Sequence, residues 1–355
     1  MSGVHEVTRE LERIRSPGYQ YSWLSAEATL ELIVGGRARL PDEPMTASAT
    51  LNAYSIMKTL TAAAVVELAA QNLIDLDAPL AALLDFPLPY REQPTVRQTL
   101  AHLGGFPNPL PLSWVHLAVE HASFDRTAFI EHVVRMNPQL KTAPGRALTY
   151  SNLGYLLLGA AIERVTHERY EAFVEHHLIR PLALAGDAVL GFEIPTPARH
   201  AAGHVRRWGI LDLALGSFLQ RRKFVTRSVG RWVEIRHHYA NGAAYGGLIA
   251  NAAGLGRYLQ ALLKPSDWLR PAAYELLFAP VRLATGVALG RSLGWFRGTL
   301  GRHGYFAHAG GGAGYYCEAR LYPDLARASL VMLNRAGVSD TRLLDSLDRY
   351  LLPAS

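Results

Sequence analysis

The sequence contains a single cysteine, Cys317, among 355 residues. One thiol cannot form an internal bridge, so a disulfide scaffold is excluded and a reducing compartment is favoured. No apolar run reaches the ~18–20 residues that a helix needs to cross a bilayer. The first 15 residues are charged and lack the apolar stretch of a secretory signal, which favours a cytoplasmic protein. With 49% hydrophobic residues, the chain can form one large core or two interleaved domains.

Lysine is also scarce, because only four of the 36 basic residues are lysines. The net charge of +6 is local. Residues 199–238 hold nine Lys or Arg against Asp212 and Glu234, a net of +7, which leaves −1 for the rest of the chain. A uniformly basic nucleic-acid-binding protein would not show this distribution, so no nucleic-acid partner is expected.

Strand-like runs occur at both ends of the chain and helical patterns fill the middle. A hairpin is expected over 18–40 with Gly35-Gly36 as its turn. Further strands are expected at 291–297, 305–309, 315–322 and 328–334, and helices at 55–70, 127–136, 153–165 and after Asp340, which can cap the last one. This pattern predicts a mixed sheet built from both termini. We expect a sheet domain over 1–58 and 244–355, and an all-helical lobe over 59–243.

Ser55 and Lys58 lie three residues apart at the start of the Ala-rich helix, so their side chains share one face. A serine hydroxyl is a poor nucleophile until a base takes its proton, and a buried lysine with a lowered pKa can be that base. The backbone N–H of Ser55 at the helix N-terminus can also stabilise a developing oxyanion. The alternative is a buried serine next to a lysine that extends to the surface.

A second element, Tyr150-Ser151-Asn152, directly precedes the helix expected over 153–165. A tyrosine beside a lysine can hold a lowered pKa and shuttle a proton, and the asparagine amide can orient the lysine and a substrate carbonyl. Tyr239-Ala240-Asn241 has the same spacing. Taken alone, either tripeptide favours a structural role over a catalytic one.

The third element is the run His308-Ala309-Gly310-Gly311-Gly312, which closes an expected strand. Its glycines would let a ligand lie against bare backbone, although a glycine-rich turn is the favoured interpretation when the run is taken alone. A dinucleotide-binding loop is excluded because no βαβ unit or downstream acidic residue accompanies it.

Together the three elements resemble the serine β-lactamase and penicillin-binding-protein family, which includes class C β-lactamase-like esterases and D-peptidases. The family pattern is Ser-x-x-Lys, then Tyr-x-Asn or Ser-x-Asn, then Lys-Thr-Gly or His-x-Gly. The likeness covers residues 50–335 through further stretches at 73–80, 95–102, 143–155, 245–248 and 293–295. Their order and context favour Tyr150 over Tyr239 as the tyrosine of the second motif.

The resemblance implies an α/β (α+β) fold of the β-lactamase/transpeptidase type, with a mixed antiparallel sheet flanked by helices and an inserted all-helical lobe. It also implies a role for each matching residue. Ser55 would accept the acyl group, and Lys58 and Tyr150 would share the base and acid roles. Asn152, His308 and Gly310 would bind the substrate, and the N–H groups of Ser55 and Gly311 would form the oxyanion hole. No metal or other cofactor is implied.

One departure from the family pattern bears on the substrate. His308-Ala309-Gly310 replaces Lys-Thr-Gly, and a largely neutral imidazole and a methyl group hold a carboxylate less well than a cation and a hydroxyl. We therefore expect an esterase or acyltransferase that acts on a small neutral acyl compound. A D-stereospecific peptidase or β-lactamase, with Arg302 or Arg320 holding the carboxylate, is the alternative enzyme. A non-catalytic binding or assembly protein with this fold is the alternative from another class.

The basic segment 199–238 allows several interpretations. Leu211, Leu215, Phe218 and Leu219 can share one helical face, and Arg221-Arg222-Lys223 follow. The segment can be a solvated insertion that packs one helix on the helical lobe. It can also be a lid over the acyl pocket, or a surface for an anionic partner such as a carrier protein or a phospholipid headgroup.

Overall fold

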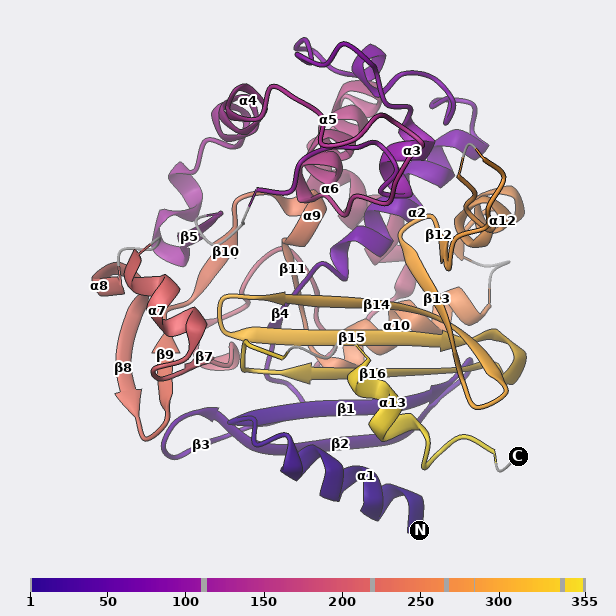
Figure 1. Cartoon of the computed structure of the whole chain (residues 1–355). Helices are drawn as coiled ribbons and strands as arrows, with labels where there is room; N and C mark the ends of the chain where they lie inside the picture. Colours follow the sequence, from indigo (N-terminus) through magenta and orange to yellow (C-terminus); the bar gives the residue numbers. More distant parts are fainter. Residues whose placement is uncertain are drawn as a thin grey trace.

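An antiparallel sheet of eight strands forms the centre of the computed structural model, which describes residues 2–109, 114–217, 221–264, 268–283, 285–338 and 342–353 (Figure 1). Both ends of the chain contribute strands, as the sequence predicted. The strand order is β12 (Arg291–Ser292), β13 (Trp295–Leu300), β14 (His303–Gly312), β15 (Tyr315–Tyr322), β16 (Arg327–Leu333), β1 (Gly18–Ser25), β2 (Thr29–Arg39) and β3 (Glu43–Pro44).

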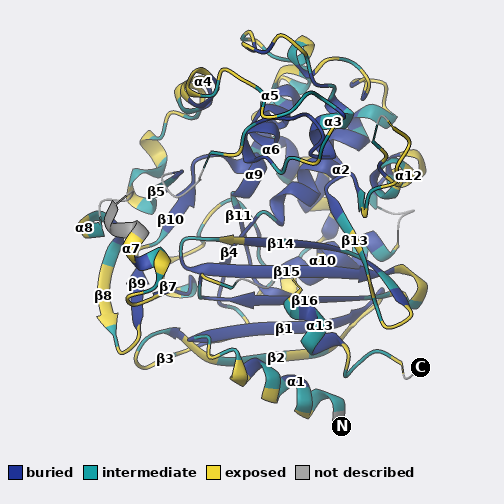
Figure 2. Ribbon diagram, in the orientation of Figure 1, coloured by how far each residue is buried: buried dark blue, intermediate teal, exposed yellow. Residues whose placement is uncertain are grey.

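Alternation of apolar side chains along the inner strands places a core on each face of this sheet. In β16, Leu330 and Met332 belong to the larger core, whereas Val331 and Leu333 belong to the smaller one. Helix α10 (Ala252–Leu263) covers the larger core, and α1 (Ser2–Arg13) and α13 (Leu343–Asp348) cover the smaller one. Figure 2 accordingly shows the inner strands as buried.

Most of the remaining helices gather beside the β14 edge of the sheet (Figure 1). The central helix there is α2 (Met57–Ala70), which is buried on nearly every side. The others are α3 (Val96–Leu100), α4 (Arg126–Met136), α5 (Asn152–Thr166), α6 (Tyr170–Val174), α9 (Ala243–Gly246) and α12 (Pro271–Phe278). Within the described ranges, no helix combines the length and apolar character needed to cross a bilayer.

Segment 59–243 carries short strands as well as helices. A small sheet of β10 (His238–Ala240) and β5 (Val115–Leu117) lies within it. A further strand of the segment, β6 (Leu190–Gly191), pairs with β11 (Leu248–Ala250), which in turn pairs with β4 (Leu51–Tyr54), and these last two strands lie outside the segment. The predicted domain boundaries at 58/59 and 243/244 stay a prediction.

The basic segment 199–238 contains more structure than the single helix that the sequence predicted. It contains a sheet in the order β7 (Gly203–Arg206), β9 (Trp232–Ile235) and β8 (Val225–Val229), together with α7 (Ile210–Ser217) and α8 (Arg221–Phe224). Of the predicted helical face, Phe218 and Leu219 lie outside the described residues. Leu211 packs on the small core of this sheet, beside Val205 and Val233.

One predicted turn, at Gly35-Gly36, and one predicted strand, at 291–297, need correction. Gly35-Gly36 lies inside β2, because the bare Gly35 lets the Tyr19 ring pack across the strand, where a Cβ would be 2.4 Å from the Tyr19 hydroxyl. The hairpin turns at residues 26–28, where Ser25 Oγ accepts the Ala28 N–H. The run 291–297 forms two strands, β12 and β13, because Gly294 with φ of +76° turns the chain between them. Asp340, the predicted helix cap, lies outside the described residues.

A buried polar cluster joins the sheet to α13. Asp348 accepts hydrogen bonds from Tyr21, Tyr322 and Ser329, and it is completely buried. Arg320, also completely buried, pairs with Glu318. These contacts hold α13 on the sheet face that is opposite to the larger core.

Candidate active site

Ser55 lies in the turn between β4 and α2, two residues before the helix begins at Met57. The Lys58 N–H donates to the Ser55 carbonyl at 3.0 Å, so the chain enters the helix through a tight turn. The preceding residue, Tyr54, has φ of +45°, a left-handed conformation that is strained for an aromatic residue. Its hydroxyl is held 2.7 Å from His238 Nε2, which fixes the strained turn that presents Ser55.

Lys58 is completely buried at the start of α2, and its amine nitrogen has three oxygen partners. Nζ lies 2.9 Å from Ser55 Oγ, 2.8 Å from Asn152 Oδ1 and 2.7 Å from the Tyr245 carbonyl oxygen. Asn152 is the first residue of α5, and Tyr245 belongs to α9. Three separate segments therefore fix the position of this amine beside Ser55.

Burial lowers the pKa of Lys58 well below the ordinary lysine value. A neutral amine donates two N–H groups, which Asn152 Oδ1 and the Tyr245 carbonyl can accept, and its lone pair is left for the Ser55 hydroxyl proton. After taking that proton, the ammonium has three N–H groups for the same three oxygens. Three tyrosine rings lie 5.1 to 5.6 Å from Nζ and stabilise the cation. The pocket therefore accommodates both charge states.

Tyr150 donates its hydroxyl hydrogen to Ser55 Oγ over 2.9 Å. The expected lowering of its pKa is wrong. Burial raises the pKa of Tyr150 to about 12, and the hydrogen bond to Ser55 and the charge of Arg291 oppose this rise only in part. Since Lys58 is itself driven towards its neutral form, it supplies little charge to favour a phenolate. Tyr150 is therefore a protonated hydrogen-bond donor in the resting site.

His102 holds Tyr150 in place. Its ring packs against the Tyr150 ring with 4.3 Å between centroids, and its Nδ1 accepts the Ser151 N–H at 3.2 Å. The imidazole is neutral, because burial, followed by the charges of Lys58 and Arg291, lowers the pKa of His102 well below its usual range. Its proton therefore lies on Nε2, and one side chain orients both the tyrosine ring and the adjoining backbone.

Strand β14 can lie against the nucleophile turn because Gly310 has no side chain. A Cβ at this position would lie 2.2 Å from the Ala53 carbonyl oxygen and 2.8 Å from the Ser55 nitrogen. Gly310 is buried against the chain's own backbone, whereas Gly311 is exposed. The structure thus brings the Gly310 backbone against the Ser55 turn, directly before Gly311 in β14, and Gly310 shapes the site without being open to a ligand.

His308 lies on the same face of β14 as Gly310, two residues earlier. It is buried, its Nδ1 lies 2.9 Å from the Ala309 carbonyl oxygen, and its Nε2 has no hydrogen-bond partner among the described residues. Burial, with a further contribution from Lys58, lowers the pKa of His308 to about 3. The imidazole is therefore neutral. Ala309 packs on the core at the opposite face of the sheet.

A cation that sequence analysis did not single out lies beside these groups. The Arg291 guanidinium stacks 3.9 Å from the centre of the Phe296 ring, and Phe296 in turn contacts His308 edge-on at 5.4 Å. Arg291 is half-buried and forms no ion pair with a carboxylate in the described part of the chain. Its charge acts on Tyr150 and His308, so it is a second basic group of the site.

The two arginines suspected from sequence do not reach the site. Arg320 is completely buried and pairs with Glu318 and Asp345 near α13. Arg302 is exposed in the turn before β14, about 20 Å along the strand from His308. The prediction of Arg320 or Arg302 as a carboxylate ligand is therefore wrong, and Arg291 is better placed.

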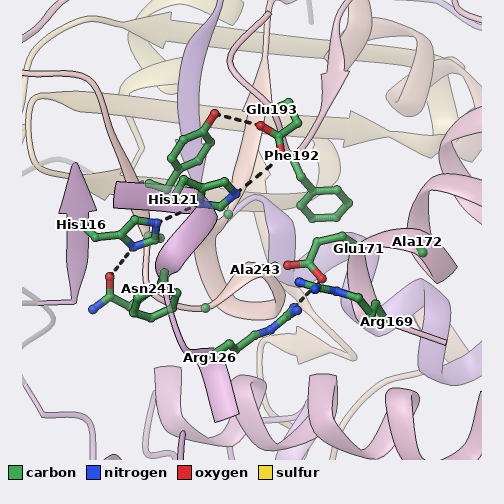
Figure 3. Close-up of a pocket in the computed structure, with 15 residues that line it drawn as sticks. His116, His121, Arg126, Arg169, Glu171, Ala172, Phe192, Glu193, Asn241 and Ala243 are labelled. Atoms are coloured by element: carbon green, nitrogen blue, oxygen red, sulfur yellow. Dashed lines mark hydrogen bonds and ion pairs between the residues drawn. The ribbon is translucent and has the colours of Figure 1, made fainter. Parts of the chain in front are cut away.

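The second candidate for the tyrosine motif, Tyr239-Ala240-Asn241, lines a separate cavity of about 310 Å³ (Figure 3). The Tyr239 hydroxyl donates to Glu193 and accepts the Ile194 N–H. His116 lies between Asn241 and His121, at 2.8 Å from each. The described contacts of this motif do not include Ser55 or Lys58, so the structure brings Tyr150, and not Tyr239, to the lysine.

Sequence reasoning missed three groups of the site. Tyr245 and His102 fall within the stretches 245–248 and 95–102 that carried the resemblance, so a signal was present. The use of a Tyr245 backbone carbonyl, however, cannot be inferred from residue type. No sequence pattern pointed to Arg291, because its position beside the site depends on the turn between β12 and β13.

A serine hydroxyl held between a buried amine and a phenol, at the edge of an antiparallel sheet, is the arrangement of serine hydrolases with the β-lactamase/transpeptidase fold. The family model described as Beta-lactamase matches residues 19–351. The chain therefore belongs to the Beta-lactamase family.

Similar proteins agree with this assignment. Penicillin-binding protein 4* of Bacillus subtilis is 25% identical over 252 residues, which are 68% of this chain and 51% of that protein. The chain thus spans about half the length of this curated relative. The D-amino acid amidase from Ochrobactrum anthropi superposes with a TM-score of 0.78 at 17% identity, over 99% of both chains. The octameric penicillin-binding protein homologue from Pyrococcus abyssi gives a TM-score of 0.76 at 18% identity, over 97% of this chain and 74% of that one. These structural likenesses show the fold.

Proposed function

We propose that this protein is a serine hydrolase that forms an acyl-Ser55 intermediate and acts as an esterase or acyltransferase on a small neutral acyl compound. The observation that carries the proposal is the position of Ser55 Oγ, 2.9 Å from both Lys58 Nζ and the Tyr150 hydroxyl. A base and an acid thus contact the same nucleophile. General-base activation of a serine hydroxyl requires such a placement of the base.

Acylation begins with the neutral amine of Lys58. Lys58 Nζ takes the hydroxyl proton as Ser55 Oγ attacks the acyl carbonyl, and the new ammonium is held by its three oxygen partners. Tyr150, protonated in the resting site, donates its proton to the leaving group, and the resulting phenolate then takes the proton that the Lys58 ammonium holds. Water or another acceptor then resolves the acyl-enzyme by the reverse sequence.

The oxyanion of each tetrahedral intermediate is assigned to the N–H groups of Ser55 and Gly311. The close contact of Gly310 with the Ser55 turn supports this assignment, because it fixes the two backbones side by side. Asn152, which bonds to Lys58 through Oδ1, has its amide nitrogen available to orient the substrate carbonyl.

The preference for a neutral acyl compound rests on His308. A neutral, buried imidazole offers no charge to a carboxylate, whereas the family's lysine does. A second candidate is supported by Arg291, whose unpaired guanidinium could bind a carboxylate on the leaving-group side. In that case the enzyme would be a D-stereospecific peptidase or a β-lactamase.

Comparison of kcat/KM for p-nitrophenyl butyrate, a D-Ala-D-Ala peptide and a cephalosporin tests the proposal. We expect the ester to be the best of the three, and Arg291→Met to leave its kcat/KM within about threefold. A better rate on the peptide or cephalosporin, with a loss of at least about tenfold in Arg291→Met, would establish the second candidate. Labelling by a fluorophosphonate probe separates both from a non-catalytic binding protein, because only an activated serine reacts.

A further inference from the structure

Three large apolar side chains project from the start of α7 into solvent. Trp208 is 76% exposed, Ile210 86% and Leu213 61%, although they lie within six residues of one another. Leu211, between them, packs inwards on the core of the β7-β9-β8 sheet. Figure 2 shows exposed residues at this helix, on the side of the molecule that carries that sheet. The first turn of α7 therefore has one apolar side chain that packs inwards, Leu211, and two that are exposed to solvent, Ile210 and Leu213.

Three arginines lie at the same place. Arg206 pairs with Trp232 in the β7–β9 register, and the Arg207 N–H donates to the Arg231 carbonyl at 2.8 Å, so all three lie at the same end of this pair of strands. The Arg207 guanidinium lies 5.2 Å from the centre of the Trp208 ring. Arg206, Arg207 and Arg231 are exposed, and none of them pairs with a carboxylate among the described residues.

The acidic residues of the basic segment do not neutralise these arginines. Asp212 is buried, where it pairs with Arg221 and accepts the Trp208 N–H. Glu234 is buried as well and pairs with Arg227. Both carboxylates are therefore withdrawn from the surface, which leaves a positive and apolar patch.

The sequence alone pointed to a different set of charges. In the run Arg221-Arg222-Lys223, Arg221 is held by Asp212, and Lys223 pairs with Glu120. Two of these three charges are thus used within the fold. We name the remaining surface, formed by Trp208, Ile210, Leu213, Arg206, Arg207 and Arg231, the α7 surface.

We propose that the α7 surface binds the headgroup region of a bilayer that contains anionic phospholipid. Guanidinium groups form hydrogen bonds and ion pairs with lipid phosphates, and a negatively charged leaflet attracts clustered arginines. Tryptophan prefers the membrane–water interface, and Ile210 and Leu213 beside it gain free energy when they enter the acyl boundary. A free phosphate or an acidic peptide would pair with the arginines but would leave the three apolar side chains in water. This inference is independent of the proposed hydrolase activity.

Sedimentation with vesicles tests the charge requirement. The protein should bind vesicles of phosphatidylcholine with phosphatidylglycerol, bind pure phosphatidylcholine much more weakly, and dissociate from the anionic vesicles as salt is raised. The triple variant Arg206→Gln/Arg207→Gln/Arg231→Gln should lose roughly 100-fold in partition coefficient, since each basic residue contributes about fivefold. The control Arg91→Gln/Arg282→Gln/Arg302→Gln removes equal charge from exposed arginines elsewhere and should bind like the parent protein.

Tryptophan quenching by brominated phospholipid tests the apolar contact. Trp208 is exposed, whereas the other five tryptophans are buried or half-buried, so quenching should occur in the parent protein and be abolished in Trp208→Phe. Replacement of Ile210 and Leu213 by serine should weaken binding by at least about tenfold. Unchanged melting temperature and p-nitrophenyl butyrate hydrolysis would show that the variants are folded.

Three results would overturn the proposal. They are the absence of binding to anionic vesicles, an equal loss of binding in the two triple arginine variants, and binding without quenching of Trp208. In the first case, salt-sensitive binding to polyglutamate would show that the surface fits an acidic protein instead.

Discussion

Replacement of Gly310 by alanine should impair catalysis more than folding. The new Cβ would lie 2.2 Å from the Ala53 carbonyl oxygen and 2.8 Å from the Ser55 nitrogen. Non-bonded carbon and oxygen atoms stay roughly 3.3 Å apart or more, so β14 must move away from the Ser55 turn by about 1 Å. This movement separates the two backbones to which we assign the oxyanion hole.

The size of both effects follows from that displacement. A misplacement of about 1 Å costs about 10²-fold in rate, and the loss of one oxyanion donor costs about 10²–10³-fold. Overpacking of one methyl group costs about 1–3 kcal/mol, which lowers the melting temperature by only a few degrees in a chain of this length. We therefore expect kcat/KM for p-nitrophenyl butyrate to fall at least about 100-fold while the protein stays folded at 25 °C.

Two alanine variants on the same strand serve as controls. At Gly304 a Cβ would meet nothing within 4 Å, and at Gly311 the nearest atoms are 3.8 Å away. Gly304→Ala should leave kcat/KM unchanged, and Gly311→Ala should retain most of it because only the backbone N–H is used. Activity of Gly310→Ala within threefold of the parent protein, at an unchanged melting temperature, would refute the assigned geometry.

Three further predictions follow from the site and the core. Tyr150→Phe should lose at least about 10²-fold in kcat/KM and Tyr239→Phe should lose less than threefold, and the reverse result would move the catalytic tyrosine to the cavity of Figure 3. Because burial lowers the pKa of Lys58, kcat/KM should rise with pH through a midpoint below the ordinary pKa of lysine. Lys58→Arg, whose side chain stays charged, should be inactive at every pH. A rise of kcat/KM with pH that survives in Lys58→Arg would exclude Lys58 as the base. Burial raises the pKa of Asp348 from 3.8 to about 6, against the partial opposing effects of Arg320 and its hydroxyl partners, so its protonated form favours folding. That contribution, at most about 3 kcal/mol, is present in full below pH 3.8 and is lost as the pH rises from 3.8 through about 6, so the melting temperature should fall between about pH 4 and 6.5 in the parent protein and less in Asp348→Asn.

The parts of the fold that could be predicted are those with a strong local pattern. The segment 315–322 is β15, and the last two long strands flank a turn at Pro323-Asp324, because apolar runs and turn residues fix such hairpins locally. The buried character of α2 follows from its Ala-rich composition, which leaves no polar face. The relation of Ser55 to Lys58 is equally local, because the turn before the helix keeps them within reach.

What could not be predicted depends on tertiary packing. The pKa of Tyr150 rises because neighbours from distant segments bury it, and no residue pattern encodes that burial. Gly35-Gly36 looks like a turn, yet Tyr19 on the neighbouring strand uses the missing side chain of Gly35. Arg291 enters the site only because Gly294 turns β12 back on β13. The free charges of the basic segment were also hidden, since they depend on which arginines the buried Asp212 and Glu234 hold.

The most direct test of the central claim is the intact mass of the protein after reaction with a fluorophosphonate probe, followed by peptide mapping. We expect a single adduct, located on Ser55, and no adduct in Ser55→Ala, whose turnover of p-nitrophenyl butyrate should fall by about 10⁴–10⁶-fold. The circular dichroism spectrum of Ser55→Ala should match that of the parent protein. An adduct on another residue, or labelling that persists in Ser55→Ala, would contradict the assignment of Ser55 as the nucleophile.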